Sequence, residues 1–182
     1  MQFDSTAFEG LKVVTPRVFG DARGYFFESY NDQEFNQAGL HFDWVQDNQS
    51  HSSYGVIRGL HFQKNPSAQT KLVRVLQGEI LDVVVDLRKD QVTYGKVFSI
   101  VLSAENKQQL LVPRGFAHGF SVLSETADVM YKCDGLYDKQ SEGGICFNDP
   151  ALAIDWKIPM DKANVSEKDV ILPGFADCDS NF

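Results

Sequence analysis

Residues 80–87 read Ile-Leu-Asp-Val-Val-Val-Asp-Leu, a short apolar run that is typical of a β-strand. Similar runs lie before and after it, and turn signals such as Gln77-Gly78 and Tyr94-Gly95 separate them. In chain order the expected strands span residues 55–63, 71–76, 80–87, 95–102, 108–113, 117–123 and 127–133. Many short strands at this spacing predict an antiparallel sandwich or barrel.

Helical patterns are scarce in this sequence. The stretch Asn31-Asp-Gln-Glu34 resembles a capping box and predicts a short helix near residues 32–39. A second helix is expected to begin at Ser166. No repeat and no low-complexity linker divides the chain, so residues 1–182 are expected to form a single domain. The predicted fold is all-β: a jelly-roll barrel of the cupin type with short peripheral helices.

The charge balance limits the classes of partner. The 182 residues include 17 basic and 25 acidic side chains, which gives a formal net charge of −8. Such an acidic protein is a poor binder of nucleic acid or of an anionic membrane, and a phosphorylated ligand would need a local cluster of Arg and Lys. Three cysteines without CxxC spacing indicate a reduced, cytoplasmic protein with neither a disulfide framework nor a zinc site. We expect neither a signal peptide nor a transmembrane helix.

The run at 55–63, Gly-Val-Ile-Arg-Gly-Leu-His-Phe-Gln, places the polar side chains of Arg58 and His61 inside an otherwise apolar strand. In a regular strand these two side chains would face opposite sides. Gly59 lies between them, and a glycine inside a strand often marks a bulge, which predicts that both face the barrel interior. The alternative is an outward-facing Arg58 in a surface ion pair, with His61 as a hydrogen-bonded core residue.

Further polar residues lie in other strand-like stretches. Lys71 begins the next strand, Tyr131 lies in a late one, and Arg23-Gly-Tyr-Phe-Phe-Glu28 adds an arginine and a glutamate. A barrel interior that holds Arg, His, Lys and Tyr together is costly unless ligand charge satisfies these groups. The pattern therefore predicts an anionic, oxygen-rich small molecule as ligand.

A bound metal is not expected. Pro113-Arg-Gly-Phe-Ala-His118 matches the PxGxxH pattern of metal-binding cupins, but His61-Phe-Gln63 lacks the second histidine of their HxH pattern. Two histidines without a carboxylate at the right spacing form a weak metal site.

Several motifs, in order along the chain, carry a resemblance to a known family. They are FGDARGYFFE (19–28), QDNQS (46–50), GVIRGLHFQ (55–63), QTKLVRV (69–75), DVVVDLR (82–88), VPRGFAHGF (112–120), and EGGI (142–145) through NDP (148–150) to Trp156. With these motifs the chain resembles the dTDP-4-dehydrorhamnose 3,5-epimerases of deoxysugar biosynthesis over essentially its whole length. The resemblance implies a jelly-roll homodimer that works without a metal or another cofactor.

The resemblance also implies a catalytic set. His61 would be the base that abstracts the protons at C3 and C5 of the sugar, which the ketone at C4 acidifies. Asp169 would orient the imidazole and stabilise its charged form. Lys71 would stabilise the enolate, and Tyr131 would return a proton from the opposite face of the ring. The implied reaction converts dTDP-4-dehydro-6-deoxy-D-glucose to dTDP-4-dehydro-L-rhamnose, in the pathway to dTDP-L-rhamnose.

Substrate-binding residues carry over in the same way. Those implied to hold the sugar and the diphosphate, besides Lys71, are Arg23, Glu28, Gln46, Asn48, Arg58, His118, Glu142 and Lys168. Tyr137 would stack on the thymine ring, and Phe19 would pack on the nucleotide from the partner subunit. A mono-epimerase acting at C3 or C5 alone, a metal-dependent cupin enzyme and a sugar-nucleotide-binding module are the alternatives.

Each of these roles has a plainer alternative. The Ser166-x-x-Asp169 spacing is also that of a helix cap, and Tyr131 fits a core tyrosine with a satisfied hydroxyl. Tyr137 fits a rim aromatic, and Glu142 and Lys168 fit solvated charges.

The chain departs from the family pattern at two turns. Lys139 stands where a proline is frequent, and residues 90–95 replace a Ser-Pro-Thr-Phe-Gly turn. These departures leave open whether the nucleotide pocket is the usual one.

Overall fold

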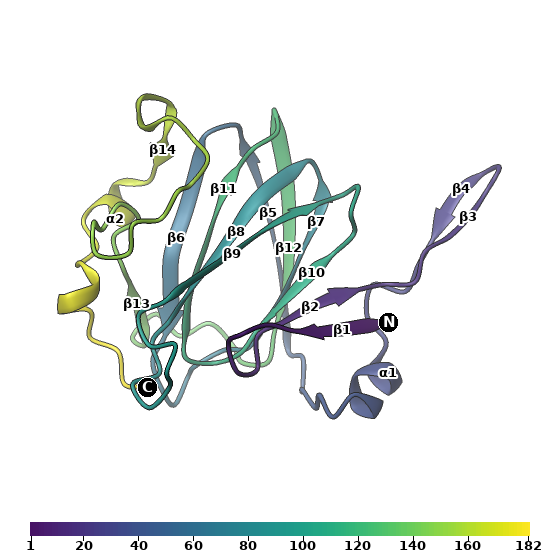
Figure 1. Ribbon diagram of the computed structural model, residues 1–182, viewed down its shortest axis with the longest axis horizontal. Helices are drawn as coiled ribbons and strands as arrows, with labels where there is room; N and C mark the ends of the chain where they lie inside the picture. The colour runs from purple at the N-terminus through teal and green to yellow at the C-terminus, as the bar shows by residue number, and fades with distance from the viewer.

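The computed structural model describes residues 1–182 and consists of two sheets that face each other across a central core (Figure 1). The first sheet has the order β1 (Gln2–Ser5), β2 (Lys12–Thr15), β10 (Gln109–Val112), β7 (Lys71–Gln77), β12 (Thr126–Cys133) and β5 (Gln46–Ser53). The second has the order β13 (Glu142–Gly144), β6 (Val56–Gln63), β11 (Phe116–Val122), β8 (Glu79–Asp86) and β9 (Val97–Ser103). These neighbours are antiparallel, and β14 (Asn164–Val165) pairs parallel with β6. The all-β prediction is confirmed.

All seven strands expected from the sequence are present, with boundaries that differ by two residues at most. The sequence does not reveal β5, whose residues Gln-Asp-Asn-Gln-Ser-His-Ser-Ser have a low intrinsic preference for strands. This segment is extended because its backbone pairs with β12 along its whole length, from Gln46 opposite Cys133 to Ser53 opposite Thr126. Tertiary pairing therefore overrides local propensity at this position.

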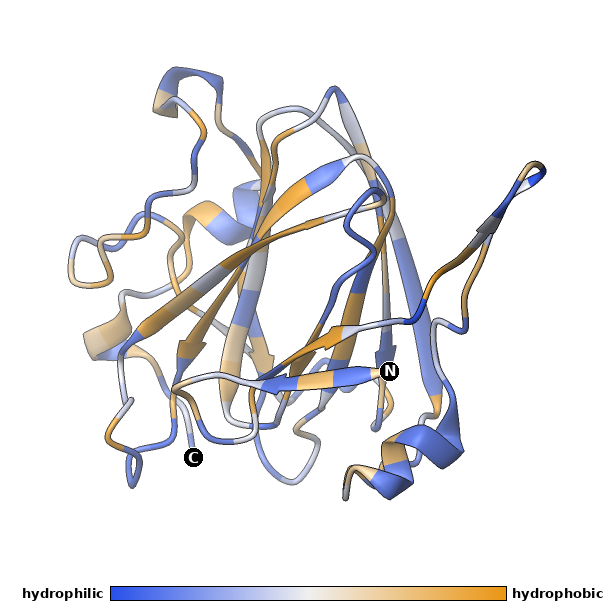
Figure 2. Ribbon diagram, turned by 45° about the vertical axis from the view of Figure 1, so that its right-hand side comes forward, coloured by the Kyte–Doolittle hydropathy of each residue, from blue (hydrophilic) through white to orange (hydrophobic).

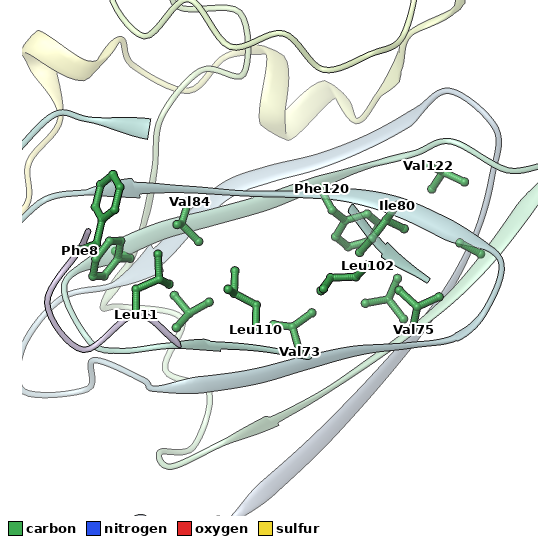
Figure 3. Packing of buried hydrophobic residues seen from close by; sticks show 14 residues of the cluster. Phe8, Leu11, Val73, Val75, Ile80, Val84, Leu102, Leu110, Phe120 and Val122 are labelled. Atoms are coloured by element: carbon green, nitrogen blue, oxygen red, sulfur yellow. The ribbon is translucent and has the colours of Figure 1, made fainter. Parts of the chain in front are cut away.

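The space between the two sheets is filled by an apolar cluster (Figure 3). Val73 and Leu110 come from the first sheet, and Ile80 and Val84 come from β8. A second cluster covers the other face of β8, where Val83 and its neighbours pack with residues such as Ile145 and Trp156 from the last part of the chain. Because β8 is buried on both faces, its sequence is a nearly continuous apolar run. Figure 2 shows this contrast between the apolar strands that cross the molecule and the hydrophilic helix α1.

The predicted bulge in β6 is confirmed. Opposite β11, His61 pairs with His118 and Arg58 pairs with Phe120, so the two residues Gly59 and Leu60 of β6 lie opposite the single residue Gly119 of β11. Gly59 has a φ of +114°, and a Cβ atom there would lie 2.6 Å from the Cα of Gly119. The bulge therefore requires glycine, and it allows Arg58 and His61 to line the same cleft.

Short helices and one hairpin lie outside the sheets. Helix α1 (Asp32–Gln37) begins at the predicted position, where the Asn31 side chain accepts the N–H of Glu34 at 3.2 Å. Helix α2 (Glu167–Val170) begins after Ser166, also as predicted, and the 3₁₀ helices η1 (Met160–Lys162) and η2 (Phe175–Asp177) flank it in the chain. The hairpin formed by β3 (Phe19–Asp21) and β4 (Gly24–Phe26) projects away from the barrel (Figure 1). None of the helices is both long enough and apolar enough to cross a membrane.

Candidate active site

A polar cleft of about 470 Å³ lies among β6, β11, β7 and β12, and the segment 164–169 closes one side of it. The predicted site residues that it brings together are Arg58, His61, Lys71, His118, Tyr131, Lys168 and Asp169. These residues come from both sheets and from the last part of the chain. His61 and Asp169, for example, are 108 positions apart in the sequence and are brought together by the fold.

His61 and Asp169 form a hydrogen-bonded pair in this cleft. The imidazole Nε2 lies 2.7 Å from Oδ1 of Asp169, and Oδ2 of the same carboxylate accepts the backbone N–H of Gly59 at 3.3 Å. Because a carboxylate can only accept, Nε2 carries the hydrogen and Nδ1 keeps its lone pair. Burial lowers the pKa of His61, whereas the charge of Asp169 opposes this shift. The imidazole is therefore neutral near pH 7 and has one nitrogen available as a base.

The Ser166-x-x-Asp169 spacing serves the helix cap and the pair at once. The Ser166 hydroxyl accepts the backbone N–H of Asp169 at 3.1 Å and caps α2. The cap uses only the amide of Asp169, so the carboxylate remains available for His61. The two interpretations of this spacing are therefore compatible.

Lys71 and Tyr131 line the cleft from the first sheet. In the ladder between β7 and β12, Tyr131 pairs with Val73 and Lys71 pairs with Cys133, so both side chains lie on the same face. The ammonium of Lys71 lies 5.7 Å from the centre of the Tyr131 ring. Burial raises the pKa of Tyr131, which keeps its hydroxyl protonated and able to donate. The ring of Tyr131 also packs against the apolar cluster between the sheets, so the residue has a structural contact as well.

Burial lowers the pKa of Lys71, and the nearby Cys133, Asp82 and Glu142 oppose this shift. An anionic group bound in the cleft would favour the charged ammonium in the same way.

Arg58 and His118 are each held by a partner that the sequence alone did not single out. The Nε of Arg58 donates to the Ser52 hydroxyl at 3.0 Å. His118 Nε2 lies 2.6 Å from Oδ1 of Asp82, which is fully buried. The one available signal for Asp82 is its position as a carboxylate inside the apolar run 80–87, because a buried charge needs a partner.

A second cavity of about 380 Å³ adjoins the first, since His61 and Lys168 line both. Here Glu142 receives two hydrogen bonds, from the Tyr137 hydroxyl at 3.0 Å and from the Lys168 ammonium at 2.7 Å. The bond to Glu142 raises the pKa of Lys168. Lys139 also lines this cavity. The two cavities together form a groove that leads from the barrel interior to Tyr137.

Gln46 and Asn48 lie beside this groove on β5. Gln46 pairs with Cys133 of β12, and Asn48 pairs with Tyr131. The side chains of Gln46 and Asn48 therefore lie on the same face of the sheet as that of Tyr131. Gln46 donates to Asn48 at 2.9 Å, and its own oxygen accepts the backbone N–H of Tyr137 at 3.1 Å. Ser50 is the next residue of β5 on the same face, and it lines the cleft. No signal in the sequence selects Ser50 as a site residue.

Phe19, Arg23 and Glu28 are not brought to the cleft within one chain. Phe19 and Arg23 lie on the projecting hairpin, where Arg23 pairs with Asp21 at 2.5 Å. Glu28 accepts from the Asn31 side chain at 3.1 Å. The site of a single chain therefore lacks three of the residues that the family resemblance implies. No group of three or more His, Cys, Asp or Glu side chains is placed to hold a metal ion.

Comparison with known proteins identifies the family. The sequence model of the dTDP-4-dehydrorhamnose 3,5-epimerases matches residues 5–177. The chain belongs to this family. It is therefore an epimerase, a class of isomerase, and the resemblance seen in the sequence motifs is confirmed.

Individual members of the epimerase family are similar to this chain along nearly its whole length. The dTDP-4-dehydrorhamnose 3,5-epimerase of Pseudomonas aeruginosa is 52% identical over 180 residues, which are 98% of each chain. The crystal structure of the Elizabethkingia anophelis enzyme has a TM-score of 0.93 at 54% identity, covering 97% of both chains. The Legionella pneumophila enzyme, solved in complex with dTDP-4-keto-L-rhamnose, has a TM-score of 0.90 at 43% identity and covers 95% of this chain and 92% of its own.

Proposed function

We propose that this chain inverts C3 and C5 of dTDP-4-dehydro-6-deoxy-D-glucose and so forms dTDP-4-dehydro-L-rhamnose. The observation that carries the proposal is that His61, held by Asp169, and Tyr131 line one cleft from different sheets. Burial lowers the pKa of His61 and raises the pKa of Tyr131, which suits the first as a base and the second as an acid. Inversion of a carbon needs one group that removes a proton and another that delivers a proton from the other side of the ring. Membership of the epimerase family and the bound ligand of the Legionella enzyme support the same reaction.

The chemistry follows from the C4 ketone of the substrate. Nδ1 of His61 takes the proton from the carbon next to the ketone, the C–H bond breaks, and its electron pair moves onto the C4 oxygen as an enolate. Asp169 stabilises the imidazolium that forms, and Lys71 stabilises the negative oxygen. The Tyr131 hydroxyl then gives its proton to the opposite face of the same carbon. As Tyr131 gives its proton, the enolate electron pair returns to the carbon and the C4 ketone forms again. His61 then loses its proton to solvent and the Tyr131 phenolate takes one up, and the same steps follow at the second carbon.

The groove offers complementary charge for a nucleoside diphosphate. Arg58, His118 and Lys168 line the cleft, and the guanidinium of Arg58 can bond two phosphate oxygens. Tyr137 is 56% exposed at the far end of the groove, where its ring is available to stack on thymine. The protein as a whole carries a net charge of −8, so Arg58 and Lys168 are the local cations that suit an anionic substrate.

We also propose a cytoplasmic homodimer with neither a nucleic-acid nor a membrane partner. Three free cysteines fit a reducing compartment. The projecting β3–β4 hairpin supports the dimer, because Phe19, Tyr25 and Phe26 are all at least half exposed on it. In a dimer this hairpin would bring Phe19 and Arg23 to the cleft of the second copy, and Glu28 follows it in the chain. Sedimentation equilibrium tests this arrangement, and a monomer at assay concentrations would contradict it.

The reaction is tested by NMR in deuterium oxide. Incubation of the 4-keto sugar nucleotide with the enzyme and the NADPH-dependent reductase that acts on its product should lead to cofactor oxidation and to deuterium at both C3 and C5. Deuterium and inversion at a single carbon would identify a mono-epimerase and overturn the double reaction. If neither C3 nor C5 exchanged its proton, epimerisation of this substrate would be contradicted altogether.

A further inference from the structure

Gln63 is the last residue of β6 and of the motif GVIRGLHFQ, but neither the catalytic nor the binding set includes it. It lies two residues after His61, and its side chain is 6% exposed. A buried amide group is costly unless its oxygen and its N–H groups find partners. The partners of Gln63 therefore indicate what this side chain holds in place.

All of these partners are backbone groups of two loops. The side-chain oxygen accepts the N–H of Asp138 at 2.8 Å. The side-chain NH₂ donates to the carbonyls of Ser67 at 2.6 Å and Leu136 at 3.2 Å. Leu136 and Asp138 are the two chain neighbours of Tyr137, so Gln63 holds the backbone immediately before and after this tyrosine.

Tyr137 depends on such backbone bonds for its position. Its side chain is more than half exposed, so packing against the barrel contributes little to its placement. Its own N–H is bonded to Gln46, and its hydroxyl is bonded to Glu142. Gln63 is the one side chain that holds the residues on both sides of it.

We infer that Gln63 is a positioning residue for the nucleotide end of the substrate. His61 and Gln63 lie on the same strand, so this strand places the base that acts on the sugar and also the loop that carries Tyr137. His61 and Tyr137 also line one cavity, so the two ends of a sugar nucleotide would meet residues that this strand positions. The inference rests on the proposed function, because it takes Tyr137 as the residue that stacks on the base.

The test replaces the amide of Gln63 while keeping the side chain about the same size. Gln63→Met removes all three hydrogen bonds and leaves His61 and Asp169 in place. The matched control is Gln109→Met, because Gln109 is also a buried glutamine that donates to a backbone carbonyl, that of Ser29, but lies outside the groove. Calorimetry measures the Kd for thymidine diphosphate, and steady-state assays measure kcat and KM.

We expect Gln63→Met to weaken binding of thymidine diphosphate about tenfold or more and to raise KM in parallel. The kcat is expected to stay within about threefold of the wild-type value, with an unchanged pH profile, because the His61–Asp169 pair is intact. The control variant should bind like the wild type even if its melting temperature falls. If Gln63→Met does not fold, Gln63→Asn, which keeps an amide one methylene shorter, is expected to show the same selective loss of affinity.

Two results would overturn the inference, and they are distinguishable from each other. Wild-type affinity in a folded Gln63 variant would show that this residue does not position the nucleotide end. A wild-type protein that does not bind thymidine diphosphate at all would remove the proposed function and the inference with it.

Discussion

Replacing Asp169 by asparagine tests the hydrogen-bond arrangement at the base more sharply than removing the side chain does. The carboxylate accepts twice, from His61 Nε2 at 2.7 Å and from the Gly59 N–H at 3.3 Å. An amide has one oxygen and one NH₂ group, so it can satisfy only one of these donors. The other contact must become unfavourable in either orientation of the asparagine.

The two orientations have separate costs. If the amide oxygen faces Gly59, the NH₂ donates to Nε2 and moves the imidazole hydrogen to Nδ1, which removes the base. The equivalent change in a serine-protease triad lowers turnover about 10⁴-fold. If the oxygen faces His61, the NH₂ opposes the Gly59 N–H at a cost of about 1–3 kcal/mol, and the loss of the charged acceptor adds about 1.5–3 kcal/mol. The cost at Gly59 is the same before and after proton transfer, so only the lost charged acceptor lowers kcat, by roughly 10–10²-fold.

Asp169→Ala has neither conflict, because it imposes no tautomer on His61 and opposes no donor. We therefore expect Asp169→Asn to be no more active than Asp169→Ala, although it is the more conservative change. Deuterium incorporation at C3 and C5, followed by NMR, measures both variants, and circular dichroism checks their fold. An asparagine variant with more than about a tenth of the wild-type kcat would refute the reasoning.

Three further outcomes follow from the same site. Tyr131→Phe should still exchange the substrate protons through His61 but should lower inversion by at least ~10²-fold, and an undiminished yield of the inverted product would contradict its role as the acid. Lys168→Met removes a charge that lowers the pKa of His61, so this pKa should rise and the acidic limb of kcat/KM should move to higher pH; a shift to lower pH would be inconsistent with this electrostatic effect. Gly59→Ala should lower the free energy of unfolding by about 2–5 kcal/mol in a denaturant titration, because its Cβ meets backbone atoms at 2.6–2.7 Å and its φ is positive. Unchanged stability would mean that β6 can adopt another conformation there.

Much of the barrel could be predicted because its inner strands have strong local signals. The strands near residues 71–76, 80–87 and 117–123 are apolar because they are buried, and turn residues mark several of their ends. The strand β5 could not be predicted in this way, since polar residues form it and its pairing with β12 comes from a segment far along the chain. The residues of β5 do not themselves indicate that a distant strand will pair with them.

The features of the site also divide into those that have a local sequence signal and those that depend on the fold. A glycine between Arg58 and His61 was a local signal for the bulge that allows both to line the cleft. The pairing of His118 with Asp82 joins side chains 36 positions apart, so the spacing of residues could not reveal it. The location of Phe19 and Arg23 on a projecting hairpin likewise depends on how the N-terminal strands leave the barrel.

The carboxylate that orients His61 reaches the barrel from outside it. Asp169 belongs to a four-residue helix near the end of the chain, and the adjoining β14 is held on β6 by only two paired residues. Sub-global opening of that terminal stretch would withdraw the carboxylate while the two sheets stay protected from hydrogen exchange. Inactivation in mild denaturant should therefore precede the cooperative loss of β-structure.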